Sequence, residues 1–136
     1  MPLQYSETLR NAQLDAIETV IGASAVLRIY DLTGAAPANT AAAIVATTLV
    51  SISLPADWMA AASAGSKVKN GAWSAVASGS GTADFFRIFS SDGTTCHGQG
   101  TVTLTGGGGD MTLDGVGITA GQTVTVNTFT INRGNA

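Results

Sequence analysis

The sequence predicts a mainly β domain: an antiparallel β-sandwich or jelly roll of seven to eight strands, preceded by one N-terminal α-helix. Apolar residues recur with a helical period only in residues 6–22, and from residue 25 they alternate with polar residues in short runs. Turn-forming residues separate these runs at roughly every 8 to 12 positions. The 136 residues therefore fit a single domain, 1–136, with the helix at 6–22 and the sandwich at 25–132.

Residues 6–22 carry the signals of an amphipathic helix. Ser6 is a good N-cap and Gly22 is a natural stop. Leu14, Ile17 and Ile21 form an apolar stripe, because they are spaced i, i+3 and i+7. Leu9, Ala16 and Val20 flank this stripe, and the wetter side holds Arg10, Asp15 and Glu18. An isolated helix of this length is marginal, so it needs a partner surface, either its own sandwich or a neighbouring subunit.

The strands are expected, in order, at residues 25–30, 44–54, 72–77, 83–89, 95–104, 111–113, 116–118 and 123–131. Pro55 ends the second of these, and a single helical turn is expected at 57–60. Residues 63–71 are rich in Ser, Gly and Asn and predict a loop or a weak edge strand. Asp92-Gly93 supports a tight hairpin, because this pair tolerates the positive φ angles that the turn requires.

The low charge of the chain limits its partners. Charged residues make up 11% of the chain, whereas an ordinary soluble domain carries about a quarter. A chain with so few charges can stay in solution if neighbouring subunits cover much of its surface. The low charge therefore favours a homo-oligomer. Only Lys67 and Lys69 of the six basic residues lie close together, so we expect no nucleic acid partner. The weakly polar stretch 41–54 is too short and too polar to span a bilayer, so we expect no membrane partner.

Cys96-His97 is the most reactive pair in the sequence, but adjacent residues on a strand point to opposite faces. They therefore cannot form a thiol–imidazole dyad within one strand. One Cys and one His in the whole chain also exclude the usual Cys/His zinc site within one subunit. We expect no catalytic residue, no metal, no cofactor and no enzymatic activity.

Two further features have a chemical and a structural interpretation. Gly106–Gly109 followed by Asp110 lacks the Lys-Ser/Thr of a phosphate loop, so a flexible connection is expected. Asp110 and Asp114 suit a carboxylate pair, although exposed turn aspartates are far commoner. Trp58 and Trp73, with Tyr30, are the residues that would stack on a sugar in a carbohydrate-binding module, and packing inside the domain is the competing role.

The sequence resembles a family of small virion proteins encoded by tailed bacteriophages and prophages. The helix region is the most distinctive part, with Tyr5–Ala12, Leu14–Ile17 and Ile21-Gly22. The resemblance extends over nearly the whole chain through Leu27–Tyr30, Pro37-Ala38, Leu54-Pro55 before Trp58, Phe86–Ile88, the Asp92-Gly93 hairpin and the alternating C-terminal strand.

This resemblance implies a structural role in the particle, as a head decoration, tail or tail-fibre-associated protein, and carries over no catalytic residue. The first expectation is a capsid decoration or cement protein that forms oligomers on the major capsid protein shell, in virions assembled in the bacterial host cytoplasm. A tail or fibre-associated protein is the second, and a carbohydrate-binding module is the third. The candidate interaction residues are Leu9, Leu14, Ile17, Trp58 and Trp73.

Overall fold

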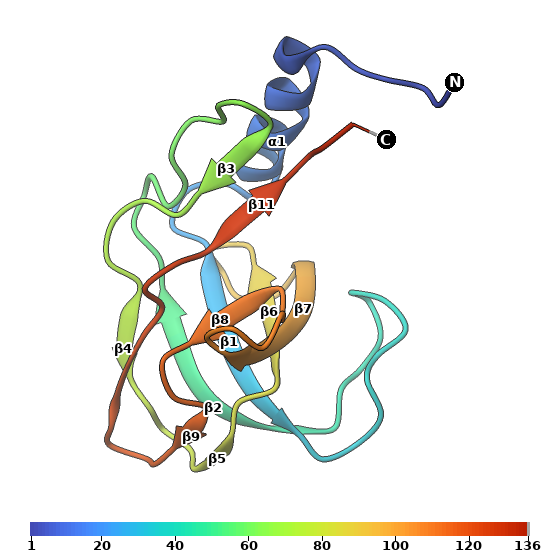
Figure 1. Ribbon diagram of the computed structural model, residues 1–136. Helices are drawn as coiled ribbons and strands as arrows, with labels where there is room; N and C mark the ends of the chain where they lie inside the picture. The colour runs from blue at the N-terminus through green and yellow to red at the C-terminus, as the bar shows by residue number, and fades with distance from the viewer. Residues whose placement is uncertain (136) are drawn as a thin grey trace.

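The computed structural model describes residues 1–135 and confirms a mainly β chain with one N-terminal helix (Figure 1). Helix α1 spans Glu7–Ile21. The strands are β1 (Val26–Leu32), β2 (Ala46–Ser53), β3 (Ser66–Val68), β4 (Ser74–Val76), β5 (Gly81–Thr82), β6 (Phe85–Phe89), β7 (Cys96–Leu104), β8 (Met111–Leu113), β9 (Gly117–Ile118), β10 (Thr123–Thr125) and β11 (Thr130–Asn132). The expected count of seven to eight strands is therefore wrong, since the described residues form eleven.

The helix begins and ends where its capping residues predict. The Ser6 hydroxyl accepts a hydrogen bond from the Leu9 backbone N–H at 3.2 Å. At the other end Gly22, with φ of +93°, donates its N–H to the Glu18 carbonyl at 2.8 Å. Among residues 1–135 no helix has the length and apolarity that a membrane crossing demands.

One five-stranded sheet, in the order β2-β1-β6-β7-β8, dominates the structure. Its neighbours pair antiparallel except for β7 and β8, which run parallel. Three two-stranded ladders complete the fold: β4 with β10, β3 with β11, and β5 with β9. In Figure 1 the helix stands beside β3 and β11 at the end of the molecule where both chain termini lie.

The core lies between the inner face of the main sheet and the ladders. Leu27 and Ile29 of β1 are fully buried, as are Val50 and Ile52 of β2. A chain of aromatic contacts then crosses the core through Trp58, Trp73, Phe129 and Phe86, with successive ring centroids 6.1, 5.5 and 5.8 Å apart.

The outer face of the sheet is also covered, because all five residues of β6 are buried. The segment 33–45 crosses this face, and two side chains of the sheet hold it. Arg87 of β6 donates to the Ala42 carbonyl oxygen at 2.7 Å, and Gln99 of β7 donates to the Pro37 carbonyl oxygen at 3.3 Å.

Two local expectations are wrong. The strand expected at 123–131 is divided into β10 and β11, which pair with different partners. Val124 and Val126 keep the alternation, but Phe129 turns inward three positions later and breaks the period of two. The helical turn expected at 57–60 is absent, because Met59 forms an antiparallel bridge with Lys69 while Trp58 fills the core.

Candidate functional site

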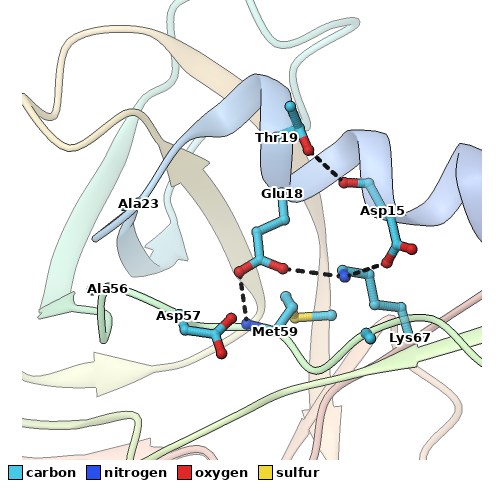
Figure 2. Close-up of a pocket in the computed structure, with 9 residues that line it drawn as sticks. Asp15, Glu18, Thr19, Ala23, Ala56, Asp57, Met59 and Lys67 are labelled. Atoms are coloured by element: carbon cyan, nitrogen blue, oxygen red, sulfur yellow. Dashed lines mark hydrogen bonds and ion pairs between the residues drawn. The ribbon is translucent and has the colours of Figure 1, made fainter.

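The helix is held against the domain by a buried lysine between two helical carboxylates. The Lys67 amine lies 2.8 Å from Asp15 Oδ1 and 3.1 Å from Glu18 Oε2, and it donates a third hydrogen bond to the Ala60 carbonyl at 2.8 Å. Figure 2 shows Glu18 between the Lys67 amine and the backbone N–H of Met59. The expectation that Asp15 and Glu18 lie on the wet side of the helix is wrong for Glu18, which is 18% exposed.

The charges in this cluster stabilise one another. Burial alone lowers the pKa of Lys67, but hydrogen bonds to Asp15 and Glu18 outweigh burial and raise that pKa above its ordinary value. Hydrogen bonds from Lys67 and from the Ala62 N–H lower the pKa of Asp15. The lysine therefore stays protonated near neutral pH, with three acceptors for its three N–H groups, and offers neither a base nor a nucleophile.

A cavity of about 590 Å³ opens beside this cluster, where Asp57 and Thr19 join its lining. Asp57 is exposed and accepts a hydrogen bond from the Asn70 side chain. Among residues 1–135 no three Asp, Glu, His or Cys side chains are placed to hold a metal ion. Lys67, Asp15 and Glu18, which line this cavity, join α1 to β3.

The opposite side of the helix carries an exposed apolar stripe. Leu9 is 44% exposed, Val20 is 69% exposed, and Ala16 between them is also exposed. Beside this stripe a groove of about 320 Å³ runs between the helix and His97 of β7. Its lining comprises Gln13, Ala16, Ile17, Val20, Ile21 and His97. Apolar side chains exposed along one face of a helix mark an interaction surface more often than isolated exposed residues do.

The five candidate interaction residues do not form one surface. Leu9 is exposed and Ile17 lines the groove, but Leu14 is 2% exposed and faces the domain. Trp58 and Trp73 are both 0% exposed, and their indole N–H groups donate to the carbonyl oxygens of Gly22 and Asn70. Both tryptophans therefore serve packing rather than surface contact.

The remaining sequence motifs stay apart from one another. Cys96 donates weakly to the Gly98 carbonyl, and burial raises the pKa of its thiol, while His97 is exposed on the helix side. The Asp110 carboxylate accepts from Thr101, whereas Asp114 accepts from the side chains of Thr105 and Asn127. The two aspartates are thus committed to different turns and do not act as a pair.

Ala16, Val20 and His97 are exposed residues of this surface that the five candidate residues do not include. The sequence does place Val20, Ala16 and Leu9 on one flank of the helix, which is the signal for a second apolar stripe. His97 carries no such signal, because its position beside the helix depends on long-range folding.

Comparison with protein-family models, with curated proteins and with solved structures finds no match. The likeness to small phage virion proteins therefore rests on the sequence motifs alone.

Proposed function

We propose that this chain is a structural protein of a tailed-bacteriophage virion, and specifically a capsid decoration protein that binds the major capsid protein shell. The observation that carries the docking part of the proposal is the exposed stripe of Leu9, Ala16 and Val20. These residues face away from the domain's own core while the stripe of Leu14 and Ile21 anchors the helix. The helix can thus pack on its domain and contact a second protein at the same time.

The composition supports the same role. A surface with few charges is suited to lasting contact with neighbours, and charged residues make up only 11% of the chain. Many copies on a symmetric shell would gain avidity from contacts that are individually weak. The main sheet and the facing ladders would supply the two layers of a sandwich-like body, with the helix presented at one end.

The first test locates the protein in the particle. Quantitative mass spectrometry of purified virions, before and after tail removal, compares this chain with the major capsid protein. Hundreds of copies that stay with tail-free heads support decoration. A few dozen copies or fewer that leave with the tails refute decoration and support a tail or fibre-associated protein.

The second test addresses the docking surface. The double variant Leu9→Glu, Val20→Glu should lose binding to tail-free heads and keep its thermal stability, because both positions are exposed. Val76→Glu is the matched control, since Val76 is 62% exposed on a different element. Leu14→Asp should instead disrupt the packing of the helix on its domain and lower thermal stability, because Leu14 is buried. Unchanged head binding by the double variant would exclude this face of the helix.

A further inference from the structure

Arg87 on the outer face of β6 is a buried cation that forms no ion pair with any of the residues 1–135. Its side chain is 6% exposed. Its Nε and Nη2 donate to Gln99 Oε1 at 3.2 and 3.0 Å, and Nη2 also reaches the Ala42 and Asn39 carbonyls. All of these acceptors are neutral, and within residues 1–135 every ion pair involves Lys67 rather than Arg87. A buried charge normally requires a counter-charge.

A second guanidinium increases the positive charge on this face. Arg28 of β1 is the direct cross-strand partner of Arg87. Like charges in that position repel one another. Arg28 also forms no ion pair in the described part of the chain. Its guanidinium carbon lies 4.5 Å from the Phe89 ring centroid, and its Nη1 donates to the Gly93 carbonyl at 3.3 Å.

A cavity of about 440 Å³ adjoins Arg87. Segment 33–45 contributes residues 40–43 to its wall, and the other side is formed by Phe89, Thr94, Thr95 and Cys96. Nη1 of Arg87 donates no hydrogen bond to any of the residues 1–135, unlike Nε and Nη2. The cavity therefore combines a charged donor, threonine hydroxyls, and the apolar surface of three alanines and a phenylalanine.

We propose that this cavity binds a single carboxylate group, with Arg87 Nη1 as its charged donor. A monoanion matches the one guanidinium that lines the cavity, and the apolar wall accepts the hydrocarbon stem of a carboxylic acid. The Thr95 hydroxyl, which donates to no described residue, supplies a second hydrogen bond. The group belongs to a small free carboxylic acid or to an acidic side chain of a second copy. This proposal does not depend on a virion role.

The test is a titration with sodium butyrate against sodium chloride at constant ionic strength, followed by backbone amide NMR. Butyrate should shift the amides of Thr94, Thr95 and Ala42 in a saturable way, and chloride should not. Arg87→Met should weaken this binding about tenfold or more, because a charge-assisted hydrogen bond is lost.

Arg87 also holds segment 33–45, so a second variant separates binding from folding. Thr95→Val keeps every hydrogen bond of Arg87 and should still weaken butyrate binding about threefold or more, since one donor is lost. A saturable shift of the same amides on raising the concentration of the unliganded protein, absent in Thr95→Val, would identify the acidic side chain of a second copy as the source.

The proposal is overturned if neither butyrate nor protein concentration shifts these amides. It is equally overturned if folded Arg87→Met or Thr95→Val binds butyrate as the wild type does.

Discussion

Replacing Lys67 by methionine tests whether the ion cluster fixes the helix to the domain. Methionine keeps much of the lysine stem and removes the ammonium group that joins Asp15, Glu18 and the Ala60 carbonyl. The Lys67 side chain itself is 2% exposed. The variant thus leaves two carboxylates side by side without their shared cation.

The expected cost follows from the exposure of each partner. Removing one member of a fully buried ion pair costs about 3–5 kcal/mol. The cost of leaving Glu18 without Lys67 falls in this range, because Glu18 is only 18% exposed. Asp15 is 47% exposed and regains water, so its pair with Lys67 contributes about 0–1 kcal/mol, as a surface pair does. We therefore expect the free energy of unfolding to fall by about 3 kcal/mol, which lowers Tm by roughly 10 °C in a domain of this size.

Urea denaturation followed by tryptophan fluorescence is the assay, because the Trp58 indole N–H donates to Gly22 at the end of the helix and reports on its docking. Lys69→Met is the matched control. Lys69 lies on the same segment, but its amine donates only to the Gly71 carbonyl and has no carboxylate partner within 4 Å among the described residues. A Lys67→Met loss within 1 kcal/mol of the control loss would show that apolar packing, and not the ion cluster, fixes the helix.

Three other outcomes are expected. The pKa of Asp15 is lowered from its ordinary value of 3.8, so the stability that this carboxylate contributes is present above pH 3.8 and is lost as pH falls through the lowered pKa. Asp15→Asn should therefore reduce the pH dependence of the unfolding free energy below about pH 4. Parallel curves for the variant and the wild type would contradict this. Trp58→Phe should cost about 1–2 kcal/mol, measured by urea denaturation, because it removes a hydrogen bond from a fully buried site, and a neutral result would mean that the Gly22 carbonyl finds water. Gly79→Ala should lower the free energy of unfolding by about 1–3 kcal/mol, because a Cβ at this position meets the Thr48 carbonyl oxygen. Gly98→Ala is the control, because a Cβ there meets nothing within 4 Å. Equal effects of the two variants would refute the steric reason.

The helix and the longer strands could be predicted because their signals are local. Ser6 and Gly22 mark the helix ends through hydrogen bonds to residues three or four positions away. The ladder of β5 and β9 could be predicted only in part. The strand expected at 116–118 covers β9, but the sequence predicts no strand at 81–82, where β5 forms. β5 is two residues long, which is too short for period-two alternation, and it pairs Gly81 with the distant Ile118.

The charged contacts were not predictable, because they join distant positions. Lys67 and Asp15 are separated by 52 residues, and nothing near Lys67 in the sequence marks it as buried. The same holds for Arg87, whose apolar neighbours Phe86 and Ile88 do predict a buried strand. Its own burial follows from the position of segment 33–45, which irregular loop residues do not encode in a periodic pattern.

The two apolar stripes of the helix show why composition alone did not identify the surface. Ile17 lies between Leu14, which is buried, and Val20, which is 69% exposed. A periodic pattern places these residues on neighbouring flanks, but it does not say which flank the domain covers. The contacts on the domain side decide this: Leu14 and Ile21 are buried and Lys67 binds Asp15 and Glu18, so Leu9, Ala16 and Val20 face outward. A partner that binds this stripe therefore meets a helix whose orientation the contacts with its own domain have already fixed.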